Sequence, residues 1–333
     1  MSAAVIDLHS HFFPESWPDY DTLFGGAPWP RLRRTGPESA TVMLGDRPFR
    51  EIHSACWDVG RRLAEMDRDG IDRQVISATP VLFAYGREGG QAVEVARFMN
   101  DHALDMAQRS GGRLVALAQV PLQDVELARA ELRRAMRAGH KGVQIGNHVG
   151  LRNLDDDALV GFLRYCADEG AAVLVHPWDM MAPERMSQYM MGWTVGMPAE
   201  TQLAIVSMIL GGAFDRLPAS LRICFAHGGG SFAWLLGRLD NAWREKESCR
   251  GRSTRLPSAY CDRFHVDSAV FDPRALGFLV DVMGEDQVML GSDYPFPLGE
   301  ARVGSRVRGA PTISEAARDK ILGENARRFL GLP

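Results

Sequence analysis

Two histidines near the start of the chain are spaced for metal binding. The segment Val5–His11 reads Val-Ile-Asp-Leu-His-Ser-His, so a short apolar run ends at His9 and His11. Residues i and i+2 of a β-strand point to the same face, with Cα atoms about 6–7 Å apart. Two imidazoles at this spacing could bind one ion, although two exposed histidines, or one in a core hydrogen bond, would also fit. The pair predicts a metal site only if the rest of the chain supplies further ligands.

Three more potential ligands stand at the ends of other short apolar runs. They are His176, His227 and Asp293. Active sites of a (β/α)₈ barrel lie at the carboxyl ends of its strands, so all five side chains would meet at one rim of such a barrel. Nitrogen and oxygen ligands without a thiolate suit Zn²⁺, and also Fe²⁺, Co²⁺ or Mn²⁺. We therefore expect a metal site, with zinc as the first choice.

The ligand set is typical of catalysis rather than of a closed structural site. Three histidines and a carboxylate leave a position open for water, whose pKa the metal lowers toward about 7. A base is then needed beside the water, and His227, which precedes Gly228–Gly230, is the best candidate. A second metal ion would need a bridging lysine or carboxylate at the end of the fourth strand, and 142–148 has neither. We expect one ion per subunit.

The elements that must position these residues alternate along the chain. Short runs rich in Val, Ile and Leu are expected to be parallel strands buried on both faces. They are 4–8, 74–78, 114–118, 142–145, 172–176, 221–226, 264–267 and 287–291. Amphipathic segments separate most of them, the clearest being 57–69, 90–110, 125–138, 155–170, 231–244 and 274–284. The alternation predicts a (β/α)₈ TIM barrel, with a doubly wound open sheet as the alternative.

Two long segments interrupt this alternation. Residues 13–56, within a single domain of residues 1–333, are rich in proline and glycine and read as an insertion after the first strand. We expect it to contain a small hairpin around Gly45 and to lie over the mouth of the barrel. The segment 178–198 carries six methionines. Such side chains either pack adaptably in a core or line the substrate pocket.

Composition limits the partners and the compartment. Lys+Arg number 38 and Asp+Glu 42, a net charge of −4, so neither nucleic acid nor an anionic membrane is expected as a partner. The N-terminus lacks the layout of a signal peptide, and the apolar stretch 203–214 is far short of the about 20 residues of a membrane span. The five cysteines form no CxxC motif and no complete disulfide framework, which favours the cytoplasm.

Four motifs resemble, in order and spacing, the decarboxylase branch of the amidohydrolase superfamily. They are DLHSHFFP at 7–14, HPWD at 176–179, HGGG at 227–230 and GSDYP at 291–295. Longer similar blocks, such as 118–124, 197–202, 229–243 and 296–300, cover nearly the whole chain. The resemblance implies a (β/α)₈ barrel of the metal-dependent amidohydrolase type. It also implies a carboxy-lyase that removes CO₂, without an oxidant, from a carboxylated muconate or benzoate.

The resemblance further implies which residues bind the metal and the substrate and which act in catalysis. The implied ligands of Zn²⁺ are His9, His11, His176 and Asp293. It places His227 beside the metal-bound water, and it implies that Arg50 and Arg238 bind the carboxylates of a small dicarboxylate substrate. Arg238 would reach the site from the neighbouring subunit of a homodimer. Planar guanidinium groups suit carboxylates, yet without the resemblance both arginines would be interpreted as solvated surface charges.

Two other functions stay open on the sequence. A metal-dependent hydrolase of lactones or cyclic amides could use the same ligands, although it would not need two carboxylate-binding arginines. A binding or regulatory protein on the same barrel should lack a catalytic group, whereas His227 and Asp293 are both present. Measuring CO₂ release against hydrolysis separates these possibilities.

Overall fold

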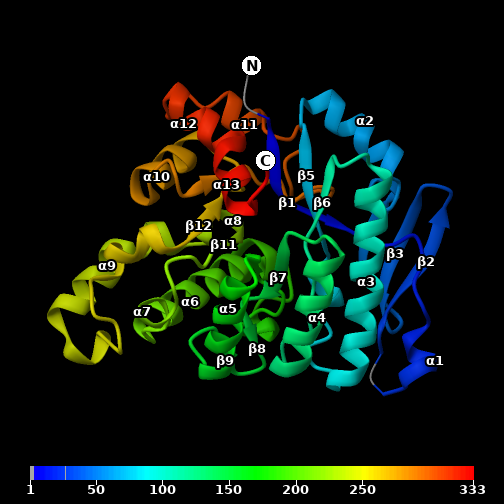
Figure 1. The fold of residues 1–333 in the computed structure, drawn as a ribbon, viewed down its shortest axis with the longest axis horizontal. Coiled ribbons are helices and arrows are strands. Elements are labelled where there is room, and N and C mark those ends of the chain that lie inside the picture. The colour runs from blue at the N-terminus through cyan, green and yellow to red at the C-terminus, as the bar shows by residue number, and fades with distance from the viewer. Residues whose placement is uncertain (1–3, 27) are drawn as a thin grey trace.

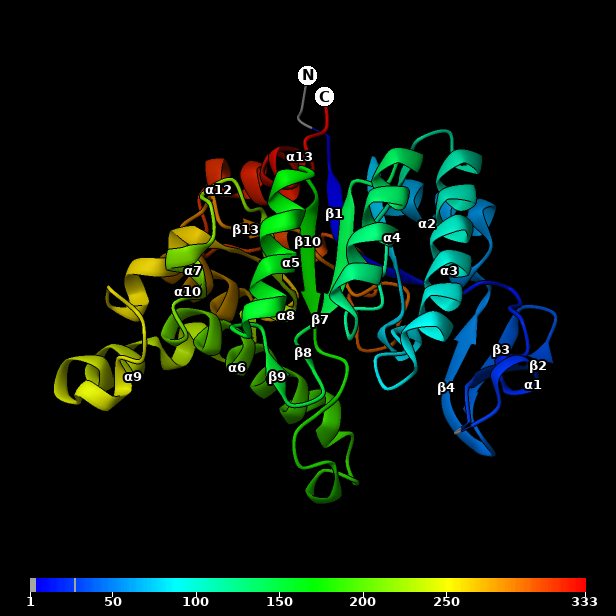
Figure 2. The same ribbon diagram turned by 60° about the horizontal axis from the view of Figure 1, so that its bottom comes forward.

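Eight parallel strands form the centre of the molecule, which a computed structural model describes for residues 4–26 and 28–333. All eight predicted strands are present within a few residues of the expected positions, and Figures 1 and 2 show how they are arranged. They are β1 (Ile6–Phe12), β5 (Arg73–Ala78), β6 (Leu114–Ala116), β7 (Gly142–Gly146), β10 (Ala172–His176), β11 (Ile223–Phe225), β12 (His265–Asp267) and β13 (Val288–Met289). Nearly all their residues are buried, as expected for strands covered on both faces.

The strands close into a barrel. One sheet has the order β1-β5-β6 and the other the order β13-β12-β11-β10-β7. A parallel bridge between Ala118 and Val143 joins β6 to β7, and a bridge between Ser10 and Tyr294 joins the chain after β13 to β1. The prediction of a (β/α)₈ barrel is confirmed, and the open-sheet alternative is wrong.

Helices surround the barrel (Figures 1 and 2). The longer ones are α2 (Val59–Asp69), α3 (Gly89–Arg109), α4 (Val125–Ala138), α5 (Asp157–Asp168), α6 (Met197–Leu210), α9 (Phe232–Glu245) and α10 (Pro273–Met283). Shorter ones are α7 (Ala213–Arg216), α8 (Ala226–Gly229), α11 (Ser305–Arg308), α12 (Glu315–Asp319) and α13 (Asn325–Leu330). In the described part of the chain, no helix combines the length and the apolar character that a membrane span requires.

Aspartate side chains fix where several of these helices begin. Asp58, Asp124, Asp156 and Asp272 each accept a hydrogen bond from a backbone N–H in the first turn of the helix that follows. Such caps satisfy N–H groups that have no partner inside the helix. The capped helices are α2, α4, α5 and α10.

The insertion after β1 is a small antiparallel sheet with one short helix. It contains α1 (Tyr20–Phe24), β2 (Pro30–Gly36), β3 (Ser39–Leu44) and β4 (Arg47–His53), and the strand order is β2-β3-β4. The predicted hairpin around Gly45 is the β3–β4 pair, whereas α1 and β2 are additions that the sequence did not indicate. Residues 1–3 and 27, which belong to the predicted domain and insertion, lie outside the described residues.

The two ends of the barrel have different coverings. In Figure 2, β10 points away from the chain termini and toward the long loop that follows it, with the insertion at the same end. The interior toward the other end is filled by apolar side chains of the strands, namely Leu8, Val75, Leu174, Cys224 and Met289, over which α13 packs. The carboxyl ends of the strands are therefore left for a site.

Candidate active site

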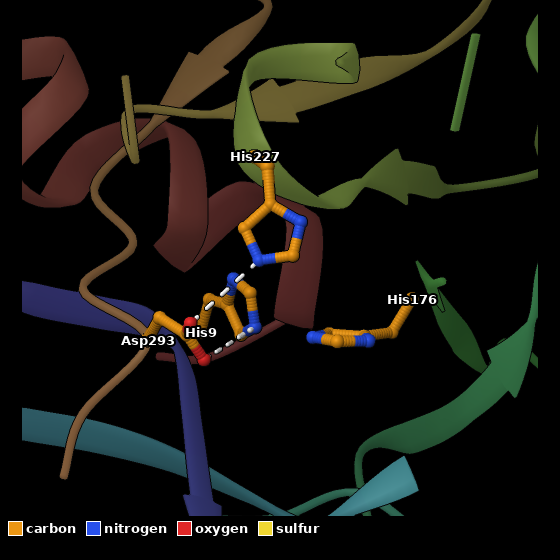
Figure 3. A group of neighbouring side chains, drawn as sticks. All are labelled: His9, His176, His227 and Asp293. Atoms are coloured by element: carbon orange, nitrogen blue, oxygen red, sulfur yellow. Dashed lines mark ion pairs between the residues drawn. The ribbon is translucent and has the colours of Figure 1, made fainter. Parts of the chain in front are cut away.

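Four of the predicted site residues surround one point at the carboxyl end of the barrel (Figure 3). They are His9, His176, His227 and Asp293, and one nitrogen or carboxylate oxygen of each lies within 4.8 Å of those of the others. The two carboxylate oxygens of Asp293 lie 3.7 Å from Nε2 of His9 and 3.8 Å from Nε2 of His227. The cluster therefore brings together donors from four separate segments of the chain.

His11 joins this cluster from the same strand as His9. Its Nε2 lies 3.1 Å from Nε2 of His9 and 3.2 Å from the Asp293 carboxylate. All five rim residues expected from the strand ends are therefore neighbours in the structure.

A β-bulge in β1 places the two histidines. Between Asp7 and Ser10, β1 advances three residues while the paired strand β5 advances two. A bulge of this kind changes which residues face each side of a sheet. Leu8 packs in the apolar interior of the barrel, and the next residue, His9, also faces inward, followed by His11. The sequence spacing of the pair correctly predicted a shared face, but not the bulge.

Two of the site residues have a left-handed backbone. His227 has a φ of 55° and Asp293 a φ of 57°, which residues other than glycine adopt rarely and mostly at functional sites. At Gly228, which has a φ of 63°, an added Cβ would lie 2.4 Å from a methyl group of Val270. The HGGG motif is therefore a tight turn that only glycine can form there, and it turns His227 into the site.

The charges of the cluster suit a divalent metal ion. Burial lowers the pKa of His11 to about 4, and burial together with the neighbouring histidines holds the pKa of His176 well below its usual range. Burial alone would raise the pKa of Asp293, but its interactions with the neighbouring His11 and His227 hold it well below the usual range. Two neutral imidazoles and an anionic carboxylate are the forms that bind metal.

His176 also shows an unsatisfied nitrogen. Its Nδ1 donates a hydrogen bond to the carbonyl of Pro177 at 2.7 Å, while its buried Nε2 has no hydrogen-bond partner. Buried polar atoms are nearly always paired in proteins, so an unpaired nitrogen beside other potential ligands fits a metal ion.

Asp267 is a residue of this site that the sequence analysis missed. It ends β12, is fully buried, and its Oδ2 lies 2.6 Å from Nδ1 of His9. The signal that selected His176, a polar residue at the carboxyl end of a predicted strand, could also have selected Asp267.

A cavity of about 860 Å³ opens onto the cluster and is walled by the insertion on one side. The loop after β10 forms another wall and contributes Trp178, Met180, Met186, Met190, Trp193 and Met197. Four of the six methionines therefore line the cavity, which agrees with the second interpretation of that segment.

The two predicted substrate-binding arginines occupy different places. Arg50, on β4, lines the cavity, and its guanidinium lies 4.0 Å from the ring centre of Phe296, which in turn stacks on His11. Burial lowers the pKa of Arg50, and among the described residues it forms no ion pair. Arg238 is exposed on α9 and is not part of the cavity wall. Only Arg50 is brought to the cluster within one subunit.

His148, at the end of the fourth barrel strand, is held by two carbonyl groups. Its ring nitrogens lie 2.8 Å from the carbonyl of Gly150 and 3.1 Å from that of Asp179. His148 therefore makes its contacts at the rim with backbone carbonyl groups. The five cysteines are free thiols and none belongs to the cluster.

Comparison with known proteins identifies the family. The amidohydrolase family model matches residues 6–332. The chain belongs to the amidohydrolase family. It is 43% identical to 2-amino-3-carboxymuconate-6-semialdehyde decarboxylase of Dictyostelium discoideum, over 98% of this chain and 91% of that protein. It is 31% identical to the Caenorhabditis elegans protein of the same name, over 98% of this chain and 94% of that one.

A solved amidohydrolase structure has the same fold. The crystal structure of 5-carboxyvanillate decarboxylase from Sphingomonas paucimobilis superimposes with a TM-score of 0.83, at 25% identity and over the whole of both chains. The resemblance to decarboxylating amidohydrolases is therefore confirmed. The longer sequence blocks around His227 and Asp293 resemble one group within this branch, the 2-amino-3-carboxymuconate-6-semialdehyde decarboxylases. The comparisons confirm this closer resemblance as well.

Proposed function

We propose that this amidohydrolase is a metal-dependent carboxy-lyase. It would convert 2-amino-3-carboxymuconate 6-semialdehyde to 2-aminomuconate 6-semialdehyde and CO₂, as the names of its relatives suggest. The observation that carries the proposal is a cavity in which Arg50, half-buried and without an ion pair to any described residue, lies beside the histidine–aspartate cluster. A proton replaces the lost carboxylate in this reaction, so neither an oxidant nor a reductant is required.

We infer that the cluster binds one Zn²⁺ per subunit. The ligands would be His9, His11, His176 and Asp293. When bound, the ion would supply a Lewis acid that activates water for the reaction. Other divalent transition metals accept the same ligands, so elemental analysis of the purified protein is needed to identify the metal.

His227 would act as the general acid and base. Its Nε2 faces Asp293, and its Nδ1 is buried without a hydrogen-bond partner. From this position Nε2 could take a proton from water while the water oxygen adds to the amino-bearing carbon of the substrate. The proton would then pass to the carbon that carries the departing carboxylate, and loss of CO₂ would expel the added oxygen as hydroxide. In the other possible route, the proton would be handed to the carbon that loses its carboxylate. Both routes interrupt the conjugation that opposes cleavage of the carbon–carbon bond.

Arg50 and Arg238 would bind the two carboxylates. Charge-assisted, paired hydrogen bonds from a guanidinium would hold the substrate so that the scissile bond lies next to the cluster. Because Arg238 is exposed and outside the cavity, we expect it to act on the site of the partner subunit in a homodimer. The reaction would serve tryptophan (kynurenine) or 2-nitrobenzoate breakdown in the cytoplasm.

A second candidate is decarboxylation of a carboxylated benzoate, which the 5-carboxyvanillate decarboxylase fold relative favours. The test is to assay the metal-loaded protein for loss of the semialdehyde's absorbance and for CO₂ release. Parallel assays would use 5-carboxyvanillate, a lactone and a cyclic amide. We expect CO₂ from the muconate substrate and none from the others. Hydrolysis without CO₂ release would contradict the proposal, and CO₂ release from the benzoate alone would support the second candidate.

A further inference from the structure

The carboxylate of Asp267 contacts both the candidate metal ligand His9 and the turn that carries His227. Its Oδ2 lies 2.6 Å from Nδ1 of His9, and its Oδ1 accepts hydrogen bonds from the backbone N–H groups of Gly228 at 2.9 Å and Ala269 at 3.0 Å. One oxygen therefore faces a candidate metal ligand. The other faces the turn that carries His227.

The contact with His9 determines where the imidazole carries its proton. A carboxylate can only accept a hydrogen bond, so a 2.6 Å contact requires the hydrogen to lie on Nδ1 of His9. In the neutral ring, the other nitrogen, Nε2, is then free to donate its lone pair. That nitrogen is the one that lies 3.7 Å from Asp293 and 3.1 Å from His11. Carboxylates commonly orient metal-binding histidines in this way.

The second oxygen of Asp267 supports an unusual backbone. Both His227 and Gly228 have a positive φ, and Gly228 is buried. Without Asp267, the N–H of Gly228 would lose its hydrogen-bond acceptor in a buried position, which is costly. The carboxylate therefore favours the turn that directs His227 toward Asp293.

The packing around Asp267 leaves room for its contact with His9. A Cβ added to Gly291, on the neighbouring strand segment, would lie 2.7 Å from Cβ of Asp267 and 2.9 Å from Cβ of His9. Any side chain larger than hydrogen at this position would push the two residues apart. Gly291 of the GSDYP motif thus leaves the space in which the carboxylate and the imidazole meet.

We propose that Asp267 is a positioning residue that keeps His9 in its metal-binding tautomer and holds His227 turned toward the same point. Asp267 acts through these two residues and binds neither metal nor substrate. This inference rests on the proposed function, because it assumes that the cluster binds a metal ion.

The test compares Asp267→Asn with the wild type by measuring metal affinity in competition with a chelator. The amide keeps an oxygen for Gly228 and Ala269, but its NH₂ group faces His9. Nδ1 of His9 must then accept a hydrogen bond, so its proton moves to Nε2. We expect Zn²⁺ affinity to fall about 10–100-fold. Asp267→Ala also loses the contact with Gly228, so its turnover per bound metal should fall below that of the Asn variant.

Asp69→Asn is the matched control. Asp69 is also a buried carboxylate, and it accepts a backbone N–H, from Val303 at 3.1 Å, while pairing with Arg68 and Arg302 away from the cavity. This variant should keep the wild-type affinity for Zn²⁺, since neutralising a distant buried aspartate does not change the tautomer of His9.

A direct observation does not depend on the folding of any variant. Long-range ¹H–¹⁵N NMR of metal-free wild-type protein, labelled at histidine, reports which ring nitrogen is protonated. A proton on Nδ1 of His9 is expected, and a neutral ring with its proton on Nε2 and none on Nδ1 would overturn the inference, as would wild-type Zn²⁺ affinity in Asp267→Asn. Wild-type protein that binds Zn²⁺ but releases no CO₂ would refute only the proposed reaction. Wild-type protein that binds no divalent metal would refute both.

Discussion

The rim of the barrel and the insertion are two walls of one cavity, and they are built in different ways. At the rim, His9, His11 and His176 are at most 3% exposed and lie on parallel strands inside the barrel. In the insertion, Arg50 lies on β4, which is an edge strand of a small sheet and is mostly exposed or half-buried. The comparison shows that the barrel fixes the candidate metal ligands, whereas a separate and more exposed element places a positive charge, that of Arg50, in the cavity.

The strongest test of this division is loss of a rim ligand. His176→Ala should lower metal affinity by more than the about 10–100-fold expected when only a supporting partner of a ligand is lost. Turnover should be lost with the metal. Elemental analysis and the CO₂ assay check this. A variant with full metal occupancy would remove His176 from the ligand set.

The second-largest effect is expected from a fall in pH, which should lower the stability of the fold through the buried histidines. Burial lowers the pKa of His11 to about 4, and burial does the same for His265, which lies outside the cluster. Between about pH 6.5 and the folded pKa, the unfolded chain binds protons that the folded chain excludes. Through these two histidines, the unfolding free energy of the metal-free protein should decrease as the pH falls through this range, by about 1–3 kcal/mol for each. Burial raises the pKa of Asp7 to about 6, which acts in the opposite direction, so the contribution of a histidine is measured by comparing variants.

Urea unfolding at about pH 7.5 and about pH 5 measures this change. His265→Gln is the control. It should remove the contribution of His265 to the pH dependence of the unfolding free energy and keep the contribution of His11. An identical pH dependence in the wild type and in His265→Gln would show that the fold does not hold His265 neutral.

A substitution in the insertion should weaken substrate binding without changing the metal content. Arg50→Met removes the charge but keeps most of the side-chain volume, so kcat/KM should fall about 10–100-fold, because a charged hydrogen bond contributes about 1.5–3 kcal/mol. Metal content should match the wild type, and Arg50→Lys should recover part of the loss. Loss of metal in Arg50→Met would show that the two walls are not independent.

The last prediction is a partial recovery of activity, and it concerns Arg238 and the dimer. Alone, His227→Ala and Arg238→Ala should both be nearly inactive. When they are mixed, each mixed dimer has one site with both an intact His227 and an intact Arg238 from the partner subunit. Random exchange should restore about a quarter of wild-type activity. Absence of recovery, with subunit exchange confirmed, would contradict a shared site.

Much of the rim could be predicted because its signals are local. Each of the strands with a site residue is a short apolar run, and a polar residue at its end is visible without knowing the fold. The barrel then brings these ends together. The contact between Asp267 and His9 was not predictable in this way, because it joins residues 258 positions apart and depends on barrel closure.

The insertion was less predictable for a physical reason. β2 reads Pro-Arg-Leu-Arg-Arg-Thr-Gly and is mostly exposed, so it lacks the apolar alternation that marks a strand. The sequence also does not reveal that Arg50 lies over the ring of Phe296, since that contact forms between the insertion and the chain after β13. Only the resemblance to amidohydrolases singled out Arg50 as a site residue.

The bulge in β1 has a consequence for how water and substrate reach the site. Two adjacent residues, Leu8 and His9, both face inward, so the candidate ligands lie directly on the apolar filling of the barrel with no spacer residue between them. This filling is apolar, and α13 packs over it. The cavity between the insertion and the loop after β10 is therefore the side from which a substrate and water would reach the cluster and by which products would leave.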